Sequence, residues 1–189
     1  MHLVFDTETT GLPRNRNAHF SDLDNWPRLV QIAWLLFDQD GELQENKNFI
    51  ILPEGFSIPD EAAKIHGITT ERAVEEGIPV RKVLAELSAS VDRSHTLVAH
   101  NIAFDENVIC AEFLRAELSH RILQKERICT MIAGTEYCQI PGPYGYKWPT
   151  LSELYYALFK EDFTEAHDAG IDVTACARCY FRLKDLHLF

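Results

Sequence analysis

The stretch Phe5-Asp6-Thr7-Glu8-Thr9-Thr10-Gly11 follows a short apolar run, His2–Phe5, at the start of the chain. The apolar run predicts a buried strand that ends in acidic and turn residues. Asp6 and Glu8 stand at positions i and i+2, so in a strand both side chains point to the same face. Neighbouring carboxylates repel each other unless a positive group joins them, and a hard cation such as Mg²⁺ or Mn²⁺ suits oxygen ligands. The alternative for this segment alone is a solvated strand end or a loop cap.

The rest of the chain predicts an α/β domain in which three antiparallel strands precede alternating strands and helices. Strands are expected at His2–Phe5, Arg28–Phe37, Leu43–Leu52, His95–Ala99 and Arg127–Thr130. Helices are expected at Pro59–Ile65, Pro79–Val91, Asn101–Leu118, Thr150–Phe159 and Ala169–Leu186, and a short turn is capped by Thr69 or Thr70. Asn101 and Thr150 are the expected N-caps of their helices. Gly67 is expected to stop the first helix.

Length and composition indicate one globular domain, residues 1–189, with 46% hydrophobic and 25% charged residues. No apolar run reaches the roughly 18 residues of a membrane-spanning helix, and Asp6 interrupts the N-terminus too early for a signal peptide. We therefore expect a cytoplasmic protein whose five cysteines are reduced thiols. Cys176 and Cys179 form a lone C-x-x-C within a predicted helix. Small core residues on one helix face are favoured there over a redox or metal pair.

The formal net charge of −11, without any basic run, disfavours a protein that binds a nucleic-acid duplex along its length. Such binders gain most of their affinity from basic patches. An enzyme that holds only a strand end at a metal site tolerates an acidic surface, because bound cations invert the local field.

Two further segments place acidic residues at the start of a helix. Leu97-Val98-Ala99-His100-Asn101-Ile102-Ala103-Phe104-Asp105 takes a strand into a helix, with Asp105 on the first turn. In Ala166-His167-Asp168-Ala169-Gly170-Ile171-Asp172, His167 and Asp172 flank the start of the last helix. An acid at a helix N-terminus often complements the helix dipole, and a lone histidine there is more often structural. The combination of all three segments is what indicates a site.

Together these segments resemble the DEDDh 3′–5′ exonuclease family, which includes the proofreading subunit of bacterial replicative polymerases, RNase T and oligoribonuclease. The family motifs D-x-E-T-T-G-L, H-N-x-x-F-D and H-x-A-x-x-D match residues 6–12, 100–105 and 167–172. Ile65-His66-Gly67-Ile68-Thr69 matches a substrate-side H-G-I segment. The motifs occur in the expected order over nearly the whole chain. The resemblance implies an RNase H-like mixed five-stranded sheet, with the first three strands antiparallel and helices on both faces.

The resemblance also implies catalytic roles at two divalent ions, Mg²⁺ or Mn²⁺. Asp6 would bridge the two ions, and Glu8 and Asp172 would bind the ion that holds the attacking water. Asp105 would serve the ion facing the leaving 3′-oxygen. His167 would be the general base for the water, since an imidazole titrates near neutral pH.

Candidates for substrate contact surround these acids: Thr7, Thr9, Gly11, Leu12, His66, Asn101 and Phe104. Leu12 would act as an apolar wedge and His66 would contact phosphate or sugar, whereas Phe104 either stacks on a base or belongs to the core. Two insertions, residues 14–27 and 139–149, mix basic and aromatic residues as single-strand contact surfaces do. Loops that pack their aromatic side chains onto the body are the favoured alternative.

The implied activity is release of 5′-mononucleotides from the 3′ end of single-stranded DNA or from unpaired 3′ ends. Trimming of RNA or degradation of short oligoribonucleotides is the first alternative, because the acids do not read the 2′-hydroxyl. A non-catalytic nucleic-acid-binding module is the second, disfavoured because all four acids and the histidine are present. The chain ends at Phe189, soon after its last helix. A stand-alone monomer or homodimer is therefore expected, rather than an enzyme tethered to a polymerase.

Overall fold

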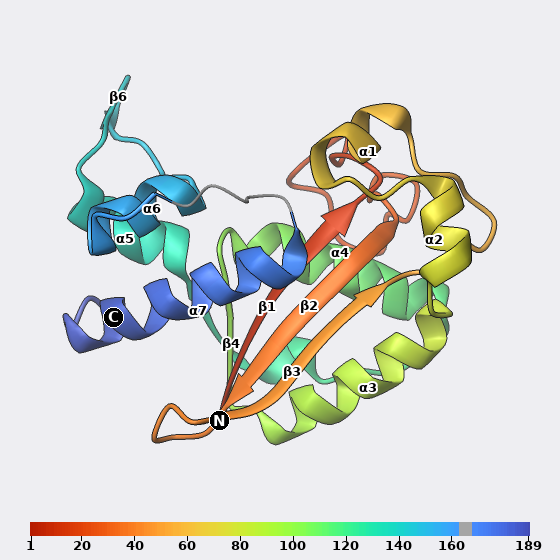
Figure 1. Cartoon of the computed structure of the whole chain (residues 1–189), viewed down its shortest axis with the longest axis horizontal. Coiled ribbons are helices and arrows are strands. Elements are labelled where there is room, and N and C mark those ends of the chain that lie inside the picture. Colours follow the sequence, from red (N-terminus) through yellow and green to blue (C-terminus); the bar gives the residue numbers. More distant parts are fainter. Residues whose placement is uncertain (163–167) are drawn as a thin grey trace.

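One mixed five-stranded sheet organises the computed structural model, which describes residues 1–162 and 168–189 (Figure 1). The strands are β1 (His2–Thr9), β2 (Leu29–Phe37), β3 (Leu43–Ile50), β4 (Thr96–Ala99) and β5 (Glu126–Cys129), in the order β3-β2-β1-β4-β5. The first three are antiparallel neighbours, whereas β4 lies parallel to β1 and β5 parallel to β4. Parallel neighbours need long crossovers, which the helices between them supply. The predicted α/β class with three leading antiparallel strands is confirmed.

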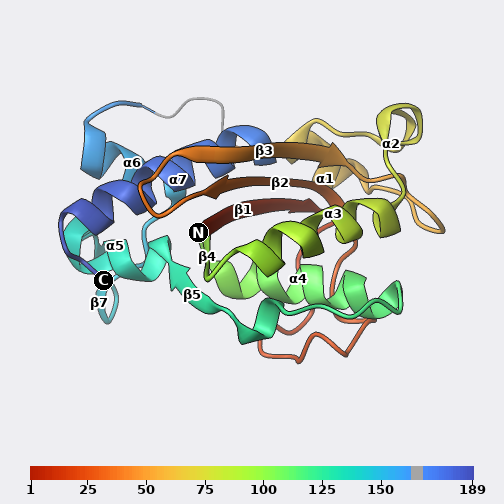
Figure 2. The same cartoon turned by 90° about the horizontal axis from the view of Figure 1, so that it is seen from below.

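Helices cover both faces of this sheet (Figure 2). One face carries α3 (Val80–Arg93) and α4 (Ile102–Arg115), and the other carries α7 (Ala169–Asp185), with α5 (Thr130–Cys138) and α6 (Leu151–Phe159) packed beside α7. The alternation along β1 explains the two layers, since Leu3 and Phe5 join the core under α3 and α4 while Val4 joins the core under α7. The polar residues that follow them are therefore divided between the same two faces.

Two short helices, α1 (Asp60–His66) and α2 (Thr70–Glu76), close one end of the sheet. Ala62 of α1 and Ala73 of α2 are buried with Val30 of β2. Gly67 ends α1 with a φ of 73°, as the sequence predicts, because glycine adopts this conformation without strain. Thr69 is the N-cap of α2.

The structure differs from the sequence prediction at the first strand and after the fifth. β1 continues beyond Phe5 to Thr9, because β2 pairs with it through Glu8. The acids therefore lie within the strand. Helix α5 was not predicted, since its β-branched residues and Gly134 favour helix weakly. Close packing against α6 stabilises this helix instead. The contact requires glycine, because a Cβ on Gly134 would lie only 2.5 Å from the Leu154 side chain of α6.

The segment between α5 and α6 holds a small hairpin, β6 (Pro141–Gly142) and β7 (Gly145–Tyr146), where the sequence predicts only a loop. A 3₁₀ turn, η1 (Ile122–Gln124), precedes β5. The predicted cap of α6 is confirmed, because the Thr150 side chain accepts a hydrogen bond from the backbone of Glu153 and the Glu153 carboxylate accepts one from the backbone of Thr150.

Candidate active site

Three carboxylates from β1 and α7 converge at the end of the sheet. Asp6 and Glu8 share the face of β1 that α7 covers, and Asp172 lies on the first turn of α7. One carboxylate oxygen of each lies within 4.8 Å of the other two. Oxygen ligands at this spacing suit a hard divalent cation.

Burial and mutual repulsion make this cluster costly to ionise. Burial first, and then the charges of Asp105, Asp172 and Glu8, raise the pKa of Asp6 well above its ordinary range. Burial, followed by the charges of Asp172 and Asp105, raises the pKa of Glu8 to about 8. A cation between the oxygens would offset both effects, so the donor set and its electrostatics fit Mg²⁺ or Mn²⁺.

A fourth carboxylate, Asp105, reaches the same strand from the opposite face. It lies on the first turn of α4, is 3% exposed, and accepts hydrogen bonds from the Thr7 backbone at 3.1 Å and the Thr7 hydroxyl at 2.7 Å. Burial raises the pKa of Asp105 to about 7, although the Thr7 bonds favour its ionised form. Asp105 thus stands apart from the three-carboxylate group while lining the same pocket as Asp6 and Glu8.

The start of α7 is held against the sheet by polar contacts that place Asp172. Asp168 caps the helix, accepting hydrogen bonds from Gly170 and Ile171. Buried Gln31 of β2 accepts a hydrogen bond from the Ala169 backbone and donates one to Asp168 at 3.4 Å. His167, the predicted general base, lies outside the described residues.

The four acids line a pocket of about 540 Å³ that also includes Asn101 and Phe104. Asn101 occupies the N-cap position of α4 as predicted, but its φ of 70° departs from the extended N-cap conformation and its side chain makes no capping hydrogen bond. The predicted N-cap position is therefore confirmed without a capping side-chain bond, and Asn101 is exposed along the pocket. Phe104 packs against the core, as one of its two predicted alternatives has it, and it also lines the pocket, so stacking on a base stays a prediction.

His100 joins the end of β4 to two distant segments through hydrogen bonds, a role that the sequence did not predict. Its Nε2 donates a hydrogen bond to the carbonyl of Pro149, so the neutral ring leaves Nδ1 to accept from the Thr130 hydroxyl, both at 3.0 Å. Burial lowers the pKa of His100 to about 4. No pattern in the neighbouring sequence predicts this role, because Thr130 and Pro149 are both distant from His100 along the chain.

The other predicted substrate contacts fall into different environments. Thr9 is buried and donates a hydrogen bond to the carbonyl of Gly11, whose φ of 147° favours glycine. Leu12 is exposed at the edge of a second groove. His66 is buried, accepts a hydrogen bond from the Ile68 backbone, and lines neither pocket. The role of His66 toward substrate stays a prediction.

The five cysteines are free thiols, and Cys176 and Cys179 are fully buried. Burial raises the pKa of both thiols, that of Cys179 to about 12. The prediction of small core residues is confirmed for this pair. Within residues 1–162 and 168–189, no helix has the length and apolar character needed to cross a membrane.

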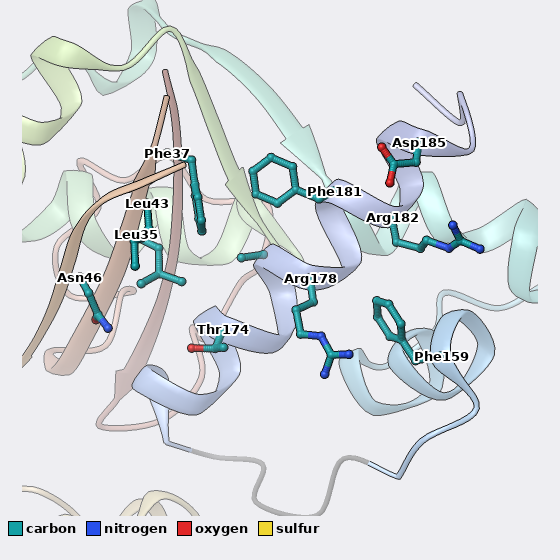
Figure 3. A pocket seen from close by; sticks show the side chains of 11 residues that line it. Leu35, Phe37, Leu43, Asn46, Phe159, Thr174, Arg178, Phe181, Arg182 and Asp185 are labelled. Carbon is teal, nitrogen blue, oxygen red and sulfur yellow. The ribbon is translucent and has the colours of Figure 1, made fainter. Parts of the chain in front are cut away.

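A separate hollow of about 460 Å³ lies between α7 and the outer strands (Figure 3). Its apolar floor includes Phe37 and Phe181, and Arg178 and Arg182 border it from α7. Among the described residues, it shares no lining residue with the acidic pocket, and Asp185 is the one carboxylate in its lining. The clustered acids therefore make the 540 Å³ pocket the candidate active site.

Comparisons with known proteins agree with this geometry. A model of the RNase T family, described as exonuclease, matches residues 3–180. Ribonuclease T of Marinobacter nauticus is 30% identical over 129 residues, which cover 61% of this chain and 54% of that protein. DNA polymerase III subunit epsilon of Buchnera aphidicola is 26% identical over 130 residues, which cover 69% of this chain and 50% of that protein.

Among solved structures, E. coli exonuclease I in complex with a dA16 oligonucleotide aligns with a TM-score of 0.73 and 21% identity. The alignment covers 100% of this chain and 42% of that one. This likeness concerns the fold, and the predicted RNase H-like class is confirmed. The chain spans about half the length, or less, of the relatives it matches.

Proposed function

The chain belongs to the RNase T exonuclease family, and we propose that its acidic pocket hydrolyses the 3′-terminal phosphodiester bond of a nucleic acid strand. The observation that carries the proposal is the convergence of Asp6, Glu8 and Asp172 within 4.8 Å, beside the buried carboxylate of Asp105. Four acids placed around one pocket support an active enzyme.

The proposal includes two divalent ions, Mg²⁺ or Mn²⁺, bound in the acidic pocket. Asp6, Glu8 and Asp172 would hold one ion, and Asp6 and Asp105 would hold the other. Such ions, when bound, supply positive charge to the attacking and leaving oxygens of a phosphodiester. Thr7 keeps Asp105 oriented, and Gln31 keeps the start of α7 against the sheet.

His167 is the proposed general base. It would take a proton from the attacking water as the water oxygen bonds to phosphorus and the bond to the 3′-oxygen breaks. The leaving 3′-oxygen takes up a proton from solvent water, so the products are a 5′-mononucleotide and a strand shortened by one nucleotide with a free 3′-hydroxyl. The support for this role is the match of His167, Ala169 and Asp172 to the family motif H-x-A-x-x-D.

Unpaired DNA 3′ ends are the proposed substrate. The net charge of −11 disfavours a long duplex contact, and exonuclease I, with the same fold, is solved in complex with a single-stranded oligonucleotide. RNA is the second candidate, supported by the similarity to a ribonuclease T. Both share the phosphodiester that the acids would act on, and the 2′-hydroxyl distinguishes them.

The test uses 5′-end-labelled strands of one sequence as single-stranded DNA, single-stranded RNA and blunt duplex DNA. Each is incubated with the full chain and Mg²⁺, Mn²⁺ or a chelator. We expect a ladder of strands shortened one nucleotide at a time, release of 5′-mononucleotides, and no reaction with chelator. Absence of shortening on every strand with either metal contradicts the proposed function. Faster shortening of RNA than DNA assigns the substrate to the second candidate.

A further inference from the structure

A second groove of about 500 Å³ adjoins the acidic pocket. Asn101, Phe104 and Trp148 line both, so the two spaces are continuous. The lining of the groove is different in character, since the described residues that line it include Arg16 and no acidic residue. Because the two spaces share these lining residues, a strand whose terminal nucleotide occupied the acidic pocket would have room for its preceding nucleotide at this groove. We infer that the groove is a nucleobase subsite for the nucleotide before the terminal one, with Trp148 as its stacking platform; the inference rests on the proposed function.

Trp148 differs from the other two tryptophans in its exposure. Its side chain is 64% exposed, whereas Trp26 is 4% exposed and Trp34 is fully buried. An indole left in water at the junction of two pockets has apolar area to bury on a ligand. Unpaired bases stack on such aromatic faces irrespective of sequence.

The backbone on both sides of Trp148 is held in place. Pro149 accepts the hydrogen bond from His100, and Lys147 donates one from its backbone to Ile140 at 2.9 Å. The Lys147 ammonium also pairs with Glu153 at 2.6 Å. Stacking on a platform that is already positioned avoids much of the entropy cost of ordering a loop.

The opposite wall of the groove comes from the insertion at residues 14–27, and it is also anchored. Arg115 of α4 donates hydrogen bonds to the carbonyls of Leu23 at 2.6 Å and Trp26 at 2.8 Å, and it pairs with buried Glu112 at 2.9 Å. The Trp26 ring donates to His19 within the insertion, so this tryptophan is structural. Arg16 remains exposed at the groove and makes no ion pair among the described residues. A guanidinium there can meet a phosphate or a base edge.

The two insertions thus have divided roles. The expectation that these loops pack their aromatic residues onto the body holds for Trp26 and fails for Trp148. The neighbouring Tyr144 is fully exposed at the hairpin tip and lines neither pocket. Tyr144 therefore provides a matched control, an exposed aromatic residue of the same insertion that the inference leaves without a role.

Kinetics on a thymidine tetranucleotide give the first readout. We expect Trp148→Ala to lower kcat/KM by about 5- to 100-fold, the range of one lost base–aromatic stack, chiefly through KM. Trp148→Phe should retain most of the rate, and Tyr144→Ala should match the wild type. Thermal melting checks that each variant is folded. A Trp148→Ala variant with the kinetics of Tyr144→Ala overturns the inference.

Tryptophan fluorescence gives a readout that does not depend on turnover. A thymidine tetranucleotide with phosphorothioate linkages, which resist hydrolysis, is added stepwise to the wild type and to Trp148→Phe in the presence of Mn²⁺. We expect the oligonucleotide to quench the emission of the wild type and to leave that of Trp148→Phe unchanged. Binding of the probe without quenching overturns the subsite. Quenching in a protein that shortens no strand would retain the subsite while contradicting the proposed function, so the two failures are distinguishable.

Discussion

Thr7 donates two hydrogen bonds to the Asp105 carboxylate, one from its backbone at 3.1 Å and one from its hydroxyl at 2.7 Å. Thr7 stands between Asp6 and Glu8 in β1, and its side chain points to the opposite face of the sheet. One strand therefore provides two carboxylates to one side and orients a third on the other. The acidic pocket is built around the end of β1 rather than on one surface.

Thr7→Val tests this relationship, because valine keeps the branched shape and removes the hydroxyl. A hydrogen bond to a charged group contributes about 1.5–3 kcal/mol, so we expect roughly a tenfold or greater loss of kcat. The hydroxyl favours ionised Asp105, so its removal should also move the acid limb of the pH–rate profile to higher pH. Thr7→Ser is the control and should preserve both. A valine variant with the rate and profile of the wild type contradicts the positioning role.

Asp172→Asn tests the three-carboxylate group. Removing one of three close negative charges should stabilise the metal-free protein, while the loss of a ligand should abolish trimming. Mn²⁺ should raise the melting temperature of the wild type and have little effect on the variant. Asp185→Asn, on the same helix but outside the acidic pocket, should behave as the wild type. Undiminished trimming by Asp172→Asn would exclude this residue as a ligand.

The raised pKa of Glu8 predicts how metal-free stability depends on pH. In the folded chain the pKa is about 8, against an ordinary value of 4.5, so the folded state binds the extra proton between these values. Stability of the metal-free protein should therefore decrease as pH rises from about 4.5 to 8. Glu8→Gln should flatten this dependence, and Mn²⁺ should restore more stability at pH 8 than at pH 5. Melting curves across this range provide the measurement; equal slopes for both proteins would count against it.

The lowered pKa of His100 predicts a dependence of stability on pH in the opposite direction, with stability lost as the pH becomes acidic. Burial gives it a folded pKa of about 4, below the ordinary 6.5, so the unfolded state binds the proton first. Its contribution to stability is complete above pH 6.5 and is lost as pH falls toward 4. His100→Gln, which can keep a donor and an acceptor, should reduce this acid loss, whereas exposed His187→Gln should not. Chemical denaturation at pH 7 and pH 4.5 distinguishes the variants, and identical acid losses would refute the assignment.

His167→Ala tests the proposed base independently of the metal ligands. The variant should lose most of its activity at neutral pH, because no imidazole accepts the proton of the attacking water. It should still be stabilised by Mn²⁺, since the carboxylates remain. Full activity at neutral pH would refute the base assignment, and loss of the Mn²⁺ effect would indicate a role in metal binding instead.

The local sequence was sufficient for the elements whose signals lie within a few residues. Period-two alternation placed Asp6 and Glu8 on one face, and Gly67 and Thr150 marked helix boundaries through their own backbone preferences. Helix α5 was not predicted, because its residues have weak helix propensity and its stability depends on packing against Leu154 of α6. Asn101 holds the predicted N-cap position, but no local pattern indicates that its backbone is left-handed and that its side chain makes no capping hydrogen bond.

By itself, the sequence determined which side chains can carry the chemistry and which strand holds the first two acids, since composition and alternation are local properties. Only the tertiary structure decided which other residues those side chains contact. It separated Asp105 from the three-carboxylate group, bound it to Thr7, and fastened Pro149 to His100 so that Trp148 stands exposed beside the pocket. These contacts join residues distant along the chain. Their partners are chosen by sheet order and by burial, which no window of sequence contains.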